Sequence, residues 1–287
     1  MDFELLSDIV QFRDRTRTLL ADEARNNLIL GILGHIIETP DAYEVVRMMV
    51  VTDGDVVTAC GLITTPPQNL ILADTISDEA LAVLADRVAG AEIDVPRVIG
   101  IRPTVDRFVD CWRLRTGQDA EPEMGQGVFA LREVTPPPPV TGRMRRADVG
   151  DFDTVLRWSR AFAAEALPDD PTDDTRLQRS VLRRLEGEVA AGTRLWEVDG
   201  IPVSMSSHTG PTGSGIRVNA VYTPPEHRRN GYASALVATH SQELLDSGYA
   251  FCFLYTDLAN PTSNKIYQAV GYDHVAESAV FRFNRAT

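Results

Sequence analysis

Near its carboxyl end the chain reads VNAVYTPPEHRRNGYASALV, from Val218 to Val237. An apolar strand is followed by two prolines, a short Arg/Gly turn and a helix that begins near Gly231. The backbone N–H groups of the first helical turn have no intrahelical partner and point to one spot in front of the helix. Together with the helix dipole and the side chains of Arg228 and Arg229, they favour an anion such as phosphate at that spot.

The glycine of this turn has a specific use. Without a Cβ, Gly231 lets a diphosphate approach the amides closely and tolerates unusual φ values. Ala233 is the next smallest residue. The pattern lacks the lysine and Ser/Thr of a nucleotide-hydrolysing P-loop, so it suits a diphosphate that is held and not cleaved. Coenzyme A carries such a diphosphate.

A second motif lies downstream. Residues 249–256 are apolar on both faces of a strand, which indicates an interior strand with a parallel neighbour. A helix follows, with Asn260 as its N-cap, Pro261 at its first position and Gly271 at its end.

Together the two motifs resemble the acyl-CoA-binding region of the GCN5-related N-acetyltransferase (GNAT) family. The signature Gln/Arg-x-x-Gly-x-Gly/Ala is matched by Arg228, Gly231 and Ala233. The second conserved block, Asn-x-x-(Ala/Ser)-x-x-x-Tyr-x-x-x-Gly-Phe/Tyr, is matched by Asn260, Ser263, Tyr267, Gly271 and Tyr272. The match covers about 55 residues in the right order and spacing.

The resemblance implies acetyl-CoA as cosubstrate and assigns roles to residues. The implied cofactor contacts are the main chain of Val221 and Thr223, the loop of Arg228, Arg229, Asn230, Gly231, Tyr232 and Ala233, and the side chains of Asn260, Ser263 and Asn264. Tyr267 corresponds to the tyrosine near the thioester sulfur that gives a proton to the departing thiolate. Two assignments stay open: Asn260 either binds the pantetheine amides or only caps its helix, and Tyr222 lines the acceptor pocket or packs in the core.

The implied mechanism is direct transfer, in which the acceptor amine attacks the acetyl carbon and a backbone N–H stabilises the carbonyl oxygen. The general base is not assigned. Family members often carry a glutamate on the motif strand, where this chain offers Asn219. Glu226, His227, His208 and a chain of waters are the alternatives. Cys252 lies in an apolar strand, and a buried thiol is inert.

Periodicity predicts a similar order of elements in the two halves of the chain. For the first half we expect helical residues over 4–39, in a helix-helix order that Pro40 stops, strands over 43–52, 55–65 and 69–73, a helix over 77–88, a strand over 97–101, a helix over 103–114 and a strand over 127–133. For the second we expect a strand over 142–146, helices over 152–166 and 172–191, and strands over 194–198 and 202–209, followed by the motif elements.

This order predicts an α/β (α+β) fold of two tandem acyl-CoA N-acyltransferase-like domains, each a mixed, mostly antiparallel sheet flanked by helices. The expected boundaries are 1–134 for the first domain, 135–141 for a proline-rich linker and 142–287 for the catalytic domain. We call the turn of residues 228–233 the cradle. The first domain has no glycine or arginine at the corresponding position, and Asp74 and Asp78 would repel a diphosphate. We therefore expect a degenerate copy that walls one side of the acceptor cleft.

Composition narrows the class of protein. The net charge is −13, the hydrophobic content is 44% and no run of eighteen apolar residues occurs. With no export signal and three scattered cysteines, the chain is expected to be soluble and cytoplasmic, without a membrane partner. The five histidines are not spaced as metal ligands. Residues 1–134 hold 12 arginines against 23 acidic residues, which argues against a nucleic-acid surface.

The sequence thus predicts an N-acetyltransferase that acts on an amine of a small molecule or peptide. Two rivals are a non-catalytic acyl-CoA-binding sensor and an aminoacyl-tRNA-dependent transferase of the same fold. The intact cradle and the acidic first half speak against the second. The acceptor, the acyl chain length and the choice between a monomer and a homodimer are not decided by the sequence.

Overall fold

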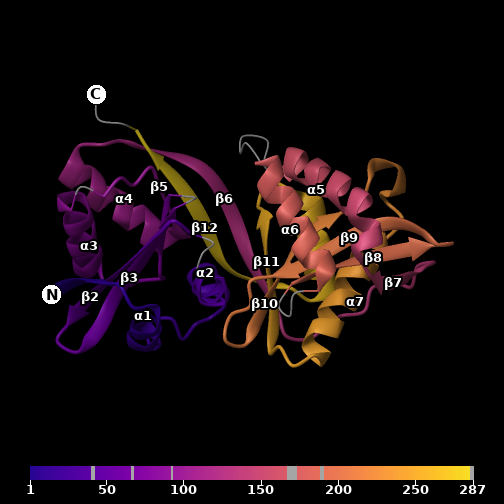
Figure 1. Ribbon diagram of the computed structural model, residues 1–287, viewed down its shortest axis with the longest axis horizontal. Helices are drawn as coiled ribbons and strands as arrows, with labels where there is room; N and C mark the ends of the chain where they lie inside the picture. Colours follow the sequence, from indigo (N-terminus) through magenta and orange to yellow (C-terminus); the bar gives the residue numbers. More distant parts are fainter. Residues whose placement is uncertain (40–42, 66–67, 92, 167–172, 188–190, 285–287) are drawn as a thin grey trace. The chain divides into compact units, whose positions relative to one another are not determined.

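The computed structural model describes residues 1–39, 43–65, 68–91, 93–166, 173–187 and 191–284. These residues form two compact units, Met1–Val128 with Val275–Thr287, and Phe129–His274. Figure 1 shows the ribbon with its elements labelled. Each unit combines a sheet with helices on both faces, so the predicted α/β fold class is confirmed.

The same order of ten elements occurs twice along the chain. The first run is β1 (Asp2–Leu6), α1 (Ile9–Thr16), α2 (Asn27–Glu38), β2 (Val45–Asp53), β3 (Val56–Thr65), β4 (Asn69–Leu72), α3 (Asp78–Gly90), β5 (Arg97–Ile101), α4 (Arg102–Thr116) and β6 (Ala120–Leu131). The second is β7 (Arg143–Arg146), α5 (Phe152–Ala166), α6 (Asp174–Glu186), β8 (Gly192–Val198), β9 (Ile201–Thr209), β10 (Gly215–Tyr222), α7 (Tyr232–Asp246), β11 (Phe251–Asp257), α8 (Pro261–Val270) and β12 (Asp273–Phe283). The repeat of β4-α3-β5 is β10-α7-β11, which contains the predicted cradle.

In the first unit the strands follow the order β1-β2-β3-β4-β5-β12. Only β4 and β5 are parallel, over Asn69–Ile71 and Arg97–Ile99. Helices α3 and α4 pack on one face of this sheet through a cluster that includes Leu84, Phe108 and Trp112. Helices α1 and α2 pack on the other face (Figure 1).

In the second unit the order is β11-β10-β9-β8-β7, and β10 and β11 form the parallel pair. Helices α5 and α6 cover one face, where Trp158 and Val181 meet Leu195 of β8. Helix α7 covers the opposite face, where Val237 and Leu236 are buried (Figure 1). Because the side chains of a strand alternate between faces, successive residues of β10 belong alternately to these two layers.

The expectation that residues 4–39 are helical is wrong for the first of these residues. Residues 2–6 form β1, an edge strand paired with β2, and two separate helices follow. Asp8 begins α1 by accepting hydrogen bonds from the amides of Val10 and Gln11, which starts a new helix instead of continuing one. A turn before α2 is fixed by the Asn27 side chain, whose amide donates to Ala24 O at 2.6 Å. Pro40, the predicted stop, lies outside the described residues.

The structure differs from the sequence analysis at two further points. Helix α6 ends at Glu186, before the predicted residue 191, because Gly187 adopts a left-handed conformation with φ of 93° and closes the helix. Residues 188–190 lie outside the described range, as do Pro66 and Pro67, where we expected a break between strands. The other difference is β12, for which the sequence analysis gave no expectation.

Strand β12 belongs to the first unit although it ends the chain. Residues 278–282 pair antiparallel with residues 101–97 of β5. Phe283 joins the first unit's core and lies 5.1 Å from Trp112 between ring centroids. The last strand of the sequence therefore completes the sheet built by the first half of the chain.

Candidate functional site

The loop before α7 leaves a row of amides open. Gly231 is the N-cap residue of α7 and has φ of 79°, a left-handed conformation that favours glycine. It offers no side chain to cap the helix. Within the described residues, no acceptor is bonded to the amides of residues 229–234. Free amides at the start of a helix, here one of fifteen residues, can donate hydrogen bonds to an anion such as phosphate.

Close packing adds a second reason for the glycine. A Cβ at position 231 would lie 2.9 Å from Cγ1 of Val140, in the proline-rich segment that precedes β7. Any larger residue would therefore have to move this segment as well as adopt a strained backbone. Arg229, beside it, also has positive φ, at 66°. Two left-handed residues within three positions turn the loop so that successive amides face one side.

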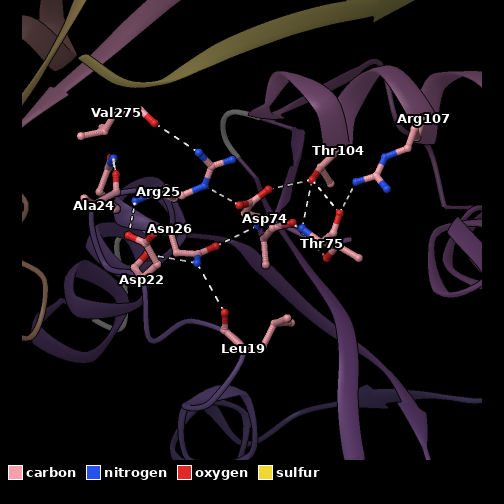
Figure 2. Close-up of polar contacts among 12 residues, drawn as sticks. Leu19, Asp22, Ala24, Arg25, Asn26, Asp74, Thr75, Thr104, Arg107 and Val275 are labelled. Carbon is pink, nitrogen blue, oxygen red and sulfur yellow. Dashed lines mark hydrogen bonds and ion pairs between the residues drawn. The ribbon is translucent and has the colours of Figure 1, made fainter. Parts of the chain in front are cut away.

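The equivalent loop of the first unit, before α3, makes several internal contacts (Figure 2). The amide of Asp74 donates to Asn26 Oδ1 at 2.8 Å, and the amide of Thr75 donates to Thr104 Oγ1 at 2.9 Å. The Asp74 carboxylate forms an ion pair with Arg25 at 2.6 Å. The side chain of Ser77 caps α3. Of the amides of residues 75–80, those of Thr75 and Ala80 are thus bonded to side chains, and no acceptor is bonded to those of residues 76–79 within the described residues. The main difference from the second unit is that this loop carries the carboxylates of Asp74 and Asp78 where the other carries Arg228 and Arg229.

The two arginines of the cradle differ in their contacts. Arg228 binds both carboxylate oxygens of Glu165 at 2.8 and 2.9 Å, and its Nε donates to Thr223 O at 2.9 Å. Its guanidinium also lies 5.7 Å from the ring centroid of Tyr222. The ion pair is exposed on both sides, and such pairs contribute little to stability, so an anionic ligand can replace Glu165. Arg229 is exposed and makes no ion pair with any described residue.

Next to the cradle the parallel strands part. The pairing of β10 with β11 covers only Gly215–Arg217 and Phe251–Phe253, although both strands continue further. A bulge follows Asn219, where Ala220 has φ of 47° and β10 bends. The result is an open main-chain edge along the second half of β10, which includes Val221. An extended ligand can pair with such an edge as an added strand does.

The structure separates the two asparagines of α8. Asn260 Oδ1 accepts the amide of Ser263 at 3.1 Å, so its oxygen caps the helix. Asn264 donates from Nδ2 to the carbonyl oxygens of Asp257 and Leu258, both at 3.3 Å. Its Oδ1 is buried and has no partner within the described residues. Asn264 thus retains a free acceptor, whereas the oxygen of Asn260 is already used.

Tyr267 lies on α8 against the same apolar cluster as Val221, with its ring centroid 6.0 Å from that of Tyr272. Burial raises the pKa of Tyr267 to about 12. A thiol has a pKa near 8.5, so full proton transfer from this phenol to a thiolate is uphill by about 5 kcal/mol. Its hydroxyl makes no hydrogen bond within the described part of the chain. The group is therefore suited to donate a hydrogen bond to sulfur while it keeps its proton.

His208 is held in a buried chain away from the cradle. Its Nδ1 lies 2.8 Å from Nε2 of His240, whose Nδ1 lies 3.0 Å from Ser206 Oγ. Burial, and then the charge of Arg194, lower the pKa of His208 to about 4. Ser204, by contrast, contacts Thr223 at the cradle end of β9. The pair is thus a neutral packing element of β9 and α7 and no base for this site.

Cys252 is also inert. Burial raises the pKa of its thiol to about 12, and its Sγ contacts the carbonyl oxygen of Ser241 at 3.7 Å. Among the described residues, no group of three or more His, Cys, Asp or Glu side chains could hold a metal ion. In the same residues, no helix has the length and apolarity needed to cross a membrane.

Two residues near the cradle escaped the sequence analysis. Glu165, near the end of α5, accepts hydrogen bonds from Arg228. In the sequence this residue looks like any solvent-exposed glutamate of a helix. Arg217 stands on β10 between buried Ile216 and Val218. A single arginine within an apolar strand is a signal that could have been read.

Comparisons with known proteins agree with this geometry. Residues 212–281 match the family model described as FR47-like protein. A search of curated proteins finds no match. Among solved structures, a GNAT-family acetyltransferase from Colwellia psychrerythraea is 10% identical, with a TM-score of 0.57 and 99% of each chain covered.

Two other solved structures are similar. A GCN5-related N-acetyltransferase from Kribbella flavida is 16% identical, with a TM-score of 0.54, over 80% of this chain and 88% of that one. A tandem GNAT protein from the clavulanic acid biosynthesis pathway is 14% identical, with a TM-score of 0.58, over 99% of this chain and 98% of that one. At these identities the likeness concerns the fold, and it extends over both units.

Proposed function

The chain has the fold of the GCN5-related N-acetyltransferases, and we propose from this premise that its second unit transfers an acetyl group from acetyl-CoA to an amine. The observation that carries the proposal is the row of open amides at residues 229–234, in front of a helix that has no side-chain cap. Amides and helix dipole together bind the diphosphate of the carrier. Arg229 adds an unpaired positive charge beside them.

The pantetheine arm and the thioester of acetyl-CoA are also assigned to groups of the second unit. The open edge of β10, with the main chain of Val221 and the amide of Thr223, pairs with the extended pantetheine arm. Asn264 Oδ1 accepts an amide N–H of the same arm, which gives this buried oxygen a partner. Acetyl-CoA thereby supplies an activated acetyl thioester at the point where β10 and β11 part.

Tyr267 completes the proposed chemistry. The amine nitrogen attacks the acetyl carbon, the new C–N bond forms, the C–S bond breaks and the thiolate departs. With a pKa of about 12, Tyr267 stabilises the developing negative charge on sulfur as a hydrogen-bond donor. The nitrogen releases one proton to solvent, and the thiolate takes one proton from solvent, while Tyr267 keeps its own.

The first unit has a different role in this proposal. Because Asp74 and Asp78 place negative charge at the start of α3, and the amides of Asp74 and Thr75 bond to Asn26 and Thr104, we infer that it does not bind a diphosphate. We assign it a structural role, and place acetyl-CoA binding and catalysis in the second unit.

The test is an assay of free thiol release from acetyl-CoA with a panel of amines, together with calorimetry of acetyl-CoA binding. Gly231→Glu places a negative charge in the cradle and should abolish both binding and release. Gly248→Glu is the matched control, since Gly248 also has positive φ, at 110°, and open space around its Cα. Equal affinity of the Gly231→Glu protein for acetyl-CoA would refute the cradle. Binding without release for any amine would favour the non-catalytic sensor.

A further inference from the structure

Arg217 occupies an unusual position on β10. It is the last residue of that strand paired with β11, so it stands where the two strands begin to part. Its guanidinium lies over the ring of Tyr255, with 4.8 Å between Cζ and the ring centroid. Its Nε is fully enclosed and has no hydrogen-bond partner, while the residue as a whole keeps some exposed surface.

No described carboxylate forms an ion pair with this guanidinium. Burial lowers the pKa of Arg217, because the charged form loses hydration that the contact with Tyr255 replaces only in part. A buried charge is ordinarily paired, and leaving it unpaired is costly. Arg217 lies where the pairing of β10 with β11 ends, a point that we call the vertex of the two strands. Because it has no carboxylate partner there, it is suited to bind an anionic group of a ligand. A planar guanidinium fits a carboxylate through two parallel hydrogen bonds.

A second unpartnered group lies beside it. Asn219 is two residues along β10, before the bulge, so its side chain shares a face with that of Arg217. Its Nδ2 donates to Thr209 Oγ1 at 2.8 Å, which fixes the amide, and its Oδ1 is enclosed without a partner. An amide oxygen in this position accepts a hydrogen bond from an amine or ammonium group. The positively charged Arg217 and the hydrogen-bond acceptor Asn219 Oδ1 are thus two residues apart on the same face of β10.

We propose that the acetyl acceptor carries a carboxylate next to its amine, as an α-amino acid does. Arg217 binds the carboxylate, and Asn219 Oδ1 binds the amine at the vertex where the thioester lies. This inference rests on the proposed function and narrows it to a substrate class. A zwitterion has no net charge, so it approaches a protein of net charge −13 without long-range repulsion. A polyamine, by contrast, would meet the charge of Arg217.

The test compares each of several α-amino acids with its own carboxamide as acceptor, at saturating acetyl-CoA. The wild-type protein should prefer the acid at least tenfold in kcat/KM, since a hydrogen-bonded charge pair contributes about 1.5–3 kcal/mol. Arg217→Met should lower kcat/KM for the acids about 10- to 100-fold. It should leave kcat/KM for the carboxamides and the KM for acetyl-CoA unchanged. Arg157→Met, on the exposed face of α5, is the control and should change neither.

Stability separates a binding role from a structural one. If Arg217 is held for a ligand, Arg217→Met removes an unpaired charge and leaves Tm unchanged or higher. A fall in Tm together with equal losses for acids and carboxamides would show a structural arginine and overturn the proposal. Arg217→Lys keeps a charge without the planar fork, so it should fold and recover only part of the preference for acids.

The outcomes also separate this inference from the proposed function. Transfer to acids and carboxamides at equal rates would overturn the inference while acetyl transfer stands. If no amine accepts an acetyl group, calorimetry of N-acetyl amino acids in the presence of CoA decides the carboxylate site. Binding that is lost in Arg217→Met would support the site without the activity, and binding that is absent or unchanged in this variant would overturn it.

Discussion

At the scale of single residues, the site is defined by groups that lack partners. Asn264 Oδ1 is a buried polar atom without a partner within the described residues, and the exposed amides around Gly231 have no protein acceptor there. Native proteins leave few such groups, because each buried one costs about 1–3 kcal/mol. Their concentration between β10, α7 and α8 is the physical reason for placing a ligand there.

Tyr267 and Tyr272 form a matched pair for testing the chemistry. We expect Tyr267→Phe to lower kcat about 10- to 100-fold with no change in the KM for acetyl-CoA, because it removes a hydrogen bond to the departing thiolate. Tyr272 donates to or accepts from Ser241 Oγ at 2.8 Å inside the core, so Tyr272→Phe should lower stability by about 1 kcal/mol and leave kcat intact. Thiol-release kinetics and thermal unfolding of both variants measure this. Unchanged kcat in Tyr267→Phe would remove this residue from the mechanism.

Glu165 competes with the ligand for Arg228. Glu165→Gln removes the carboxylate that holds the guanidinium, so we expect acetyl-CoA to bind a few times more tightly, in line with about 0.2–1 kcal/mol for an exposed ion pair. Asp153→Asn, on the same helix and also exposed, is the control for net charge. Calorimetry at low and high salt measures the difference. Weaker binding in Glu165→Gln would mean that Glu165 positions Arg228 for the ligand.

At the scale of elements, α7 joins two regions of different chemistry. Its first turn carries the open amides, and its middle carries His240, which pairs with His208 on β9. The charged groups around this pair are Arg194, Glu243, Arg146 and Arg184. Because burial lowers the pKa of both histidines, the pair resists protonation and holds α7 on the sheet in its neutral form.

This pair predicts a loss of stability in acid. The pKa of His208 falls from its usual 6.5 to about 4 on folding, so the unfolded chain binds a proton that the folded chain does not between these values. The contribution is complete above pH 6.5 and declines by about 3 kcal/mol as pH falls to 4. Urea unfolding across this range should show a flatter pH profile for His208→Gln/His240→Gln than for the wild type. His274→Gln, at an exposed site, should keep the wild-type slope. An equal slope in the double variant would contradict the assignment.

The elements near the motif could be predicted because local signals agree there. Strand β5, helix α5 and the cap of α8 at Asn260 were expected at the residues where they occur, since apolar periodicity and capping residues coincide. The amino-terminal region could not be read, because apolar residues at helical spacing hide a strand that exists only through pairing with β2. Arg217 could have been noticed as a single arginine within an apolar strand, but the lack of a carboxylate partner becomes visible only in the folded chain.

At the scale of the whole molecule, the chain order and the folding units do not coincide. The repeat of ten elements would end each half with its own last strand, yet β12 pairs with β5 of the first unit. The sequence-based boundary at residue 142 follows the repeat. The pairing of β12 with β5 leaves no local signature in the sequence of either strand. Because β12 closes the first unit's sheet, that unit depends on residues that are synthesised after the second unit.

This dependence can be tested by supplying the strand separately. We expect residues 1–134 alone to remain unfolded, because β5 would lack its partner and Trp112 would lose the contact with Phe283. Addition of a peptide of residues 273–284 should restore a cooperative thermal transition, since an added strand gains both main-chain hydrogen bonds and apolar burial. A peptide with Phe281→Ser and Phe283→Ser keeps the main chain but loses the core contacts, and it should restore little. If residues 1–134 fold cooperatively without any peptide, the first unit is independent of β12, and the boundary given by the sequence repeat describes its folding better than the strand pairing does.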